Sequence, residues 1–416
     1  MRIIIGAVLL IFSLSLKAQD SKDTVYFKKK VLETIDVDIL MSYYTQSGTH
    51  AAVSGGIGDE SLQDITPTLV VSVPLNEDDV LTVDAGISAY TSASSSNINP
   101  FDSRNSTSPA SPYQASSGAS RSDVLAHVSG SYSHSSDDRN TVSSGHVSLS
   151  NEFDYFSFGF GGGYNKSLND KNTELGLKAN VFLDNWRPQY PVEFKRLSSF
   201  KRLTSTSRNS YSLGLSYAQV ISKKLQSLVN IDGIYQKGLL STPFQRVYFA
   251  DVADRYQEDF PIADDIERLP DTRFKFAIGA FINYYINDIF VLRTFTRYYQ
   301  DDWNIKSWTA SVEIPVKISE YFTLYPSYRF YNQTAADYFA PYNVHLSTDT
   351  YYTSDYDLSE FSANQYGFGL SYTDIFTSAH LWRFGLKSID LKYNYYKRNS
   401  GLKAHLVSFG MKFQLD

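Results

Sequence analysis

The stretch GLKAHLVSFGMKFQL, residues 401–415, contains the pattern that decides the fold. Apolar side chains occupy every second position, at Val407, Phe409, Met411, Phe413 and Leu415. Small or polar residues fill the positions between them, at Ser408, Gly410, Lys412 and Gln414. Successive side chains of a β-strand point to opposite faces, so this run predicts a strand with one apolar and one polar face.

The same period-two pattern continues upstream as far as Glu33, in runs of about 10–14 residues separated by turn-forming residues. We count sixteen such strands, with an uncertainty of two in either direction, and almost no helical spacing. The predicted strands are 33–44, 62–74, 80–92, 121–134, 141–150, 156–166, 172–184, 207–220, 225–237, 272–285, 289–299, 303–317, 321–333, 361–374, 382–396 and 401–415.

The length of each connection depends on whether the strand before it has an odd or an even number. The five long connections, 45–61, 93–120, 185–206, 238–271 and 334–360, all follow odd-numbered strands, and the connections after even-numbered strands are short. A soluble β-sandwich has no reason to sort its loops in this way, and its strands are usually shorter. The pattern predicts a closed antiparallel transmembrane β-barrel with short periplasmic turns, long extracellular loops and both termini in the periplasm.

Composition removes several classes of function. The 416 residues include no Cys, which excludes disulfides, thiol catalysis, Cys-ligated metals and a lipid-anchored cysteine. The formal charge of −6 argues against nucleic acid as a partner. No nucleophile elbow, P-loop or zinc-protease motif is present, so we predict no enzyme, no catalytic residues and no cofactor. His127 and His146 are expected to face inward on neighbouring strands, where lumen polarity explains them better than metal binding.

The N-terminus has the order of a secretory signal peptide. Arg2 precedes an apolar run from Ile3 to Leu16, which is shorter than a membrane-spanning helix requires. We therefore expect a signal peptide over residues 1–18, a short periplasmic segment over 19–32, and a barrel over 33–416 in the outer membrane of a Gram-negative bacterium.

Four segments carry a family resemblance: Thr91–Ser95 continuing to Asn99-Pro100, Ser117–Arg121, Tyr132–Asn140 and Glu267–Arg273. Together they resemble a domain-of-unknown-function family of outer-membrane proteins from Bacteroidota and some proteobacteria. The resemblance covers nearly the whole mature chain and implies a barrel of unknown activity. Relatives are often encoded near thioredoxin-like proteins, a small lipoprotein and an enzyme that attaches flavin to proteins, which implies a redox or flavin-linked setting.

The polar face of each strand predicts the lining of the lumen. The first nine strands place an acidic wall there, formed by Asp36, Asp38, Asp84, Glu174 and Asp232. Strands ten to thirteen place a basic wall, formed by Lys275, Arg293, Arg297 and Arg329. A transverse field between such walls selects polar solutes. Direct pairing of these charges within a filled interior is an equal alternative. Gly159, Gly161 and Gly163 also face inward, and relief of strain explains them slightly better than a ligand does.

The long loops carry two further charge clusters. Carboxylates at Asp251, Asp254, Asp259, Asp264 and Asp265 are candidate calcium ligands, although a solvated acidic loop is the better interpretation. A basic cluster comprises Arg187, Lys195, Arg196, Lys201, Arg202 and Arg208, with Glu193 as its single acid. At the outer surface it would bind phosphates of membrane lipid and lipopolysaccharide.

The leading functional prediction is a passive, porin-like channel for small polar solutes or ions. The alternative is a non-conducting barrel whose long loops dock an outer-membrane lipoprotein or a redox partner.

Overall fold

The computed structural model describes residues 29–92, 122–257 and 260–415. The predicted signal peptide and most of the segment 19–32 lie outside the described residues. So do Ser117–Arg121 and, apart from Thr91 and Ser92, the first of the segments that carry the family resemblance.

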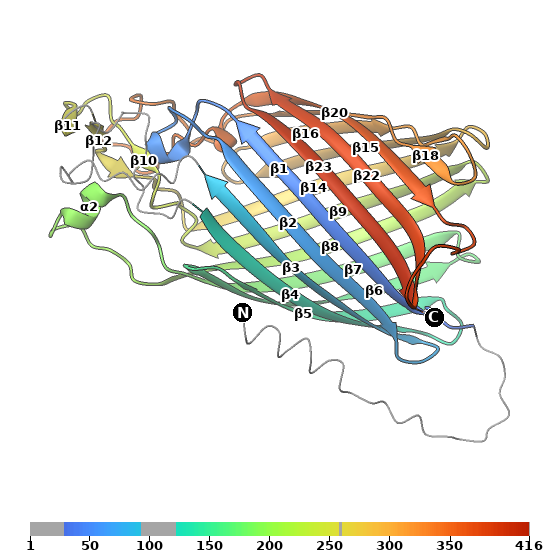
Figure 1. Cartoon of the computed structure of the whole chain (residues 1–416). Coiled ribbons are helices and arrows are strands. Elements are labelled where there is room, and N and C mark those ends of the chain that lie inside the picture. Colours follow the sequence, from blue (N-terminus) through green and yellow to red (C-terminus); the bar gives the residue numbers. More distant parts are fainter. Residues whose placement is uncertain (1–28, 93–121, 258–259, 416) are drawn as a thin grey trace.

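Sixteen antiparallel crossings form one closed barrel, as the alternation predicts (Figure 1). Each crossing is one strand, except for two that are interrupted. The crossings are β1 (Ile35–Ser47), β2 (Leu62–Pro74), β3 (Asp79–Ser92), β4 (Ser122–Ser135), β5 (Thr141–Asn151), β6 (Tyr155–Leu168), β7 (Thr173–Trp186), β8 (Thr206–Ser222), β9 (Leu225–Gly238), β14 (Thr272–Tyr285), β15 (Val291–Asp301), β16 with β17 (Lys306–Glu313, Val316–Lys317), β18 with β19 (Phe322–Leu324, Ser327–Gln333), β20 (Phe361–Thr373), β22 (Phe384–Arg398) and β23 (Lys403–Leu415).

The barrel closes where the last strand pairs with the first. β23 and β1 are antiparallel over their full length, from Ile35 opposite Leu415 to Ser47 opposite Lys403. Figure 1 shows this seam as the red strand beside the blue one. Closure leaves no sheet edge, so backbone groups within the lipid layer find their partners inside the protein.

Prolines explain the two interrupted crossings. Pro315 separates β16 from β17, and Pro326 separates β18 from β19. A proline has no N–H to donate to the ladder. Its carbonyl still accepts, and Ile314 N–H donates to Pro326 O at 3.0 Å. The ladder therefore continues through both interruptions.

The two rims differ as the sequence predicts. At the short-turn rim, where β1 begins and β23 ends, the connections are 75–78, 136–140, 169–172, 223–224, 286–290, 318–321 and 374–383, the last of which carries β21 (His380–Leu381). The opposite rim carries the long described loops 48–61, 187–205, 239–271 and 334–360. Those loops hold the short elements η1 (Ala52–Ser54), α2 (Val192–Arg196), β10 (Arg246–Val247), β11 (Arg255–Gln257), β12 (Phe260–Ile262), β13 (Asp265–Ile266) and η3 (Tyr356–Leu358). Within the described residues, no helix is long and apolar enough to cross a membrane.

The outer face of the wall is apolar and exposed, as β8 illustrates. Tyr211, Leu213, Leu215 and Tyr217 have 41–53% of their surface exposed, and serine or glycine separates them. A soluble protein rarely exposes so continuous an apolar surface. The lipid layer is the medium that such a belt requires, so the intervening residues face the lumen.

Candidate functional site

The inner face of the wall can be followed through the strand register from β1 to β23. Asp36 lies opposite Ser72 on β2 and Gln414 on β23, and the same polar face continues around the barrel. The five residues predicted to form the acidic wall lie on this face: Asp36, Asp38, Asp84, Glu174 and Asp232. The four residues predicted to form the basic wall share it: Lys275, Arg293, Arg297 and Arg329.

Most of the ion pairs on the inner wall join neighbouring strands. Asp36 lies 3.2 Å from Lys387 Nζ and 3.1 Å from Lys412 Nζ. Asp84 lies 3.1 Å from His127 Nε2, and Arg293 lies 3.0 Å from Glu313. Local pairing therefore neutralises part of each predicted wall.

Sequence reasoning missed one buried pair on this face. Arg273 donates to Asp301 from Nε at 3.0 Å and from Nη2 at 2.5 Å, and the Asp301 side chain is fully buried. The guanidinium also lies 4.1 Å from the ring centroid of Trp303. The period-two pattern places Arg273 on the inner face, but it gives no information about a partner 28 residues away.

The inward glycines make room for neighbouring side chains. A Cβ on Gly159 would lie 2.3 Å from Ser148 Oγ and 2.7 Å from the Phe182 ring. A Cβ on Gly161 would likewise lie too close to the ring of His146. Close packing within the wall is therefore the physical reason for both glycines, and it does not require a ligand.

The long loops at the rim opposite the termini lock together into one body, which we call the cap: the described residues of 48–61, 187–205, 239–271 and 334–360 (Figure 1, left). Its centre is a buried ion pair between Arg246 and Glu193, whose side chains are 0% and 4% exposed. Arg246 Nε and Nη2 donate to the two Glu193 oxygens at 2.6 and 3.1 Å, and Nη1 donates to Val53 O at 2.9 Å. One guanidinium thus ties three loops together.

Apolar and aromatic contacts complete the cap. Phe194, Tyr248 and Ala263 form one buried cluster across two loops. His50 stacks on Tyr356 with ring centroids 3.8 Å apart, which joins the first of these loops to the last. These contacts indicate an ordered cap.

The cap is anchored to the inner wall at the mouth of the lumen. Arg398 Nη1 donates to Asp357 at 2.7 Å, and Gln333 Nε2 donates to the carbonyls of Asp357 and Ser359. On another part of the wall, Arg208 Nε donates to Leu239 O at 2.9 Å. These hydrogen bonds attach the cap to the inner wall at this rim.

Glu267 is a buried carboxyl group in the cap. It accepts from Thr242 N–H and Thr353 Oγ1, each at 2.5 Å, and only 4% of the residue is exposed. Burial, and then the nearby charge of Asp355, raise the pKa of Glu267 to about 8. The carboxyl is accordingly protonated at neutral pH.

The candidate calcium ligands are separate hydrogen-bond acceptors rather than a cation cage. Asp251 accepts from Ser347, Asp264 from Phe249 N–H, and Asp265 from Tyr352. Asp254 accepts only a long bond from Tyr256, and Asp259 lies outside the described residues. Over the described part of the chain, no three His, Cys, Asp or Glu side chains gather closely enough to hold a metal ion. The acidic residues of this loop instead connect the cap internally.

The predicted basic cluster divides into two parts. Arg187, Lys195, Arg196, Lys201 and Arg202 lie in loop 187–205. The expectation that Arg208 lies at the outer surface is wrong: it is on the inner face of β8, 4.9 Å from the Trp186 ring centroid and bonded to Leu239 O. Two residues along the strand from Ser210, its side chain follows the period-two alternation into the lumen.

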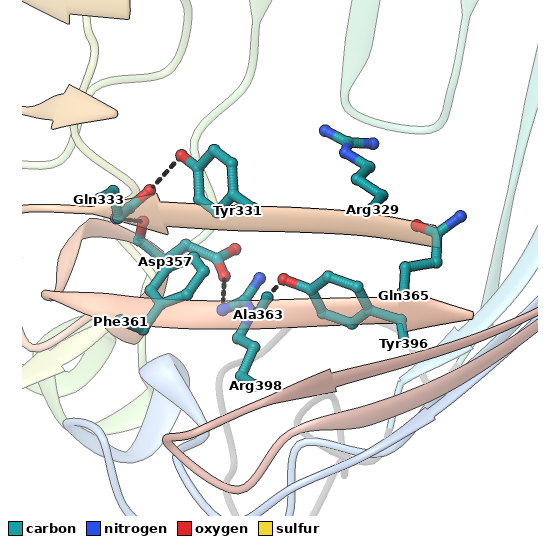
Figure 2. A pocket seen from close by; sticks show the side chains of 9 residues that line it. All are labelled: Arg329, Tyr331, Gln333, Asp357, Phe361, Ala363, Gln365, Tyr396 and Arg398. Carbon is teal, nitrogen blue, oxygen red and sulfur yellow. Dashed lines mark hydrogen bonds and ion pairs between the residues drawn. The ribbon is translucent and has the colours of Figure 1, made fainter. Parts of the chain in front are cut away.

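Two cavities adjoin the inner wall on the strands from β16 to β22. One, of about 350 Å³, is lined by residues that include Arg329, Tyr331, Gln365, Tyr396 and Arg398 (Figure 2). The other, of about 260 Å³, shares Arg329 and Gln365 with it and adds Tyr325 and Lys392. Both lie among polar side chains of the predicted lumen.

With this geometry established, the relationship to known proteins can be stated. Residues 6–410 match the family model described as "Protein of unknown function (DUF3570)". The chain belongs to this family. No curated protein matches the sequence.

Several solved structures resemble this member of the family. One is a bacterial polysaccharide outer membrane secretin, with 8% identity, a TM-score of 0.46, and coverage of 91% of this chain and 98% of that one. Another is OccK1 (OpdK) of Pseudomonas aeruginosa, with 9% identity, a TM-score of 0.39, and coverage of 92% and 98%. A third is the siderophore receptor PirA from Acinetobacter baumannii, with 11% identity and a TM-score of 0.45. The alignment to PirA covers 89% of this chain and about half of the receptor, 54%.

Proposed function

We propose that this outer-membrane β-barrel is a passive channel for small polar solutes or ions, with both termini in the periplasm. The carrying observation is the polar inner face, which continues around all sixteen crossings and borders cavities of about 350 and 260 Å³. Barrels of sixteen strands are wide enough to enclose an aqueous path. Short periplasmic turns are the rule in such barrels, which supports the orientation.

Charge on the wall explains why polar solutes would be favoured. Glu174 and Lys178 both face the lumen on β7 with exposed side chains. A charged wall attracts ions and dipolar molecules. An apolar molecule would displace water from the charged groups without offering them a polar contact in return. The proposal involves transport without chemistry, so no residue is given a catalytic role.

Conductance in a planar lipid bilayer tests the proposal directly. The purified mature chain, reconstituted from detergent, should give discrete current steps, and detergent alone should give none. Barrels that insert repeatedly, verified by protease protection, yet never conduct would overturn the proposal.

A second candidate, docking of an outer-membrane lipoprotein or redox partner, is favoured by one observation. The cap exposes apolar side chains at Val344, Leu346 and Tyr256, with 54%, 46% and 57% of their surfaces accessible. Co-purification of a stable partner after cross-linking in cells, its loss in Val344→Asp/Leu346→Asp, and an absence of conductance would select docking over transport.

We also propose that loop 187–205 binds phosphates of membrane lipid or lipopolysaccharide. Its one acid, Glu193, is paired with Arg246, so the remaining charged residues of the loop are all basic. Burial, and then the charge of Arg202, lower the pKa of Lys195, which indicates that two cations lie close together. Binding to lipopolysaccharide vesicles should weaken in Lys195→Gln/Arg202→Gln, and equal binding by this variant would contradict the assignment.

A further inference from the structure

Arg329 differs from Arg398, the other arginine that lines the larger of its two cavities. It lies on the inner face of β19, opposite Ser311 on β16 and Gln365 on β20, and its side chain is exposed to the lumen. Within the described part of the chain, no hydrogen bond or ion pair reaches its guanidinium. Three other arginines of the inner face are paired: Arg273 with Asp301, Arg293 with Glu313, and Arg398 with Asp357. Arg297 on β15 has no such partner among the described residues, but it lines neither cavity. In Figure 2, dashed lines join Arg398 to Asp357 and to Tyr396, and none reaches Arg329.

The surroundings of Arg329 add donors and positive charge. Arg329 and Gln365 line both cavities, so the free guanidinium stands where the two meet. Lys392 lines the smaller cavity, where its Nζ lies 5.3 Å from the centroid of the Tyr325 ring. The one carboxylate that lines this smaller cavity, Glu313, is already paired with Arg293 at 3.0 Å. The smaller cavity therefore has a net positive lining.

Tyrosine rings supply the apolar part of the lining. Tyr331 and Tyr396 line the larger cavity, and the Tyr396 hydroxyl accepts from Arg398 Nε at 3.0 Å. Because the hydroxyl oxygen of Tyr396 accepts that bond, its proton points away from Arg398. A solute with an anionic head and a small apolar body thus meets a cation, further donors and aromatic surface within one space.

We propose that Arg329 is the centre of an anion-binding site in the lumen, and that the solutes it recognises are small organic carboxylates. The proposal rests on the proposed function, since it names the class of solute for the same lumen. A guanidinium presents two parallel N–H groups that match the two oxygens of a carboxylate, so an unpaired arginine favours that head group over a spherical ion. A cation over a lumen wall also raises the local concentration of anions.

Benzoate is a suitable probe, because it combines a carboxylate with one aromatic ring. Its binding to the barrel in detergent micelles is measured by saturation-transfer NMR for the wild type, Arg329→Gln, Arg329→Lys and Lys178→Gln. Lys178 is the matched control, since it is an exposed inward cation on β7 that lines neither cavity. Arg329 makes no contact that folding depends on, so its variants should insert normally.

The site predicts a graded result. Arg329→Gln should weaken benzoate binding by about tenfold, which corresponds to the loss of one exposed bidentate bond. Arg329→Lys keeps the charge without the planar fork and should weaken binding by roughly threefold. Lys178→Gln should change it by less than about twofold, because screening limits a remote charge. An equal effect of Arg329→Gln and Lys178→Gln, or an absence of saturable binding by the wild type, overturns the proposal.

Current through the same variants separates this inference from the proposed function. Benzoate should reduce the chloride current of the wild type more strongly than that of Arg329→Gln. Channels that conduct but respond equally to benzoate in both proteins overturn the site and leave the channel intact. Saturable binding that depends on Arg329, in a barrel that never conducts, overturns the channel and leaves the site.

Discussion

Replacing Arg246 by methionine should release the cap while leaving the barrel wall closed. The Arg246 side chain is fully buried, and its loss leaves Glu193 as an unpaired carboxylate of which 4% is exposed. Removing one partner of a buried ion pair costs about 3–5 kcal/mol, because the remaining charge loses its compensation. The bond from Nη1 to Val53 O is lost as well. The wall is unaffected, since its ladder involves none of these groups.

Hydrogen exchange followed by mass spectrometry measures this effect loop by loop. A loss of 3–5 kcal/mol corresponds to roughly a hundred- to several-thousand-fold faster exchange for amides protected by cap closure. The change should appear in residues 48–61 and 187–205 together, since Arg246 connects both loops. Peptides from β7 and β8 should exchange at the wild-type rate.

Two controls make the result specific to a buried charge. Arg268→Met removes an exposed pair with Asp265, in which the arginine is 56% exposed, and should cost at most about 1 kcal/mol. The double variant Arg246→Met/Glu193→Met removes both charges and should recover much of the lost protection. Equal exchange in Arg246→Met and Arg268→Met would refute the reasoning, as would a double variant that opens further than the single one.

Three further predictions concern the cap, the lipid face and closure. Burial raises the pKa of Glu267 from 4.5 to about 8, so the closed cap retains a proton that the open cap releases. The stability that this proton gives to the closed cap is complete below about pH 4.5 and is lost as the pH rises to about 8. Glu267→Gln should flatten this pH dependence, which is measured as protection factors of cap amides corrected for intrinsic exchange. Leu215→Arg on the lipid face should destabilise the barrel by about 2–4 kcal/mol if the site lies near the bilayer midplane, measured by guanidinium unfolding from vesicles. Ser216→Asn, on the inner face, should have little effect on the same free energy of unfolding. Cysteines at Ile39 and Met411, which are opposite each other across the seam, should cross-link within one chain, and the native sequence has no Cys to compete; a product of dimer mass alone would contradict closure.

The wall could be predicted almost completely because two different media impose one period. Lipid on one side and water on the other constrain every residue, and the turns interrupt the alternation visibly. The predicted runs 62–74 and 272–285 coincide with β2 and β14. Their boundaries are sharp because Asn76 and Asp271 lie in polar connections where the apolar series stops.

The period-two pattern could not predict which charged residues of the inner wall form ion pairs with each other. Alternation assigns Asp36 to the inner face, but its partners Lys387 and Lys412 stand on the last two strands. Their proximity depends on closure and on the register at the seam. A one-residue slip of that register would turn these side chains to the opposite face.

The cap could not be predicted at all, because its order comes from contacts that no period encodes. Glu193 and Val53 are 53 and 193 positions from Arg246, and the sequence between them is polar loop and strand. A cluster of charges in a loop suggests solvation, and here the central pair is buried instead.

The cap and the wall are electrostatically linked at the mouth of the lumen. Asp357 belongs to η3 of the cap, and it cancels the charge of Arg398 on β22. Arg329 aligns with Gln365 and Tyr396, two residues along β22 from Arg398, and so lies about 7 Å farther from the cap along the wall. The carboxylate that the cap contributes therefore neutralises the outer cation and leaves the inner one free. Of the two guanidiniums that line the larger cavity, an anion that passes the cap would find only that of Arg329 unpaired, so the position of η3, as well as the composition of the wall, determines the charge that a solute encounters.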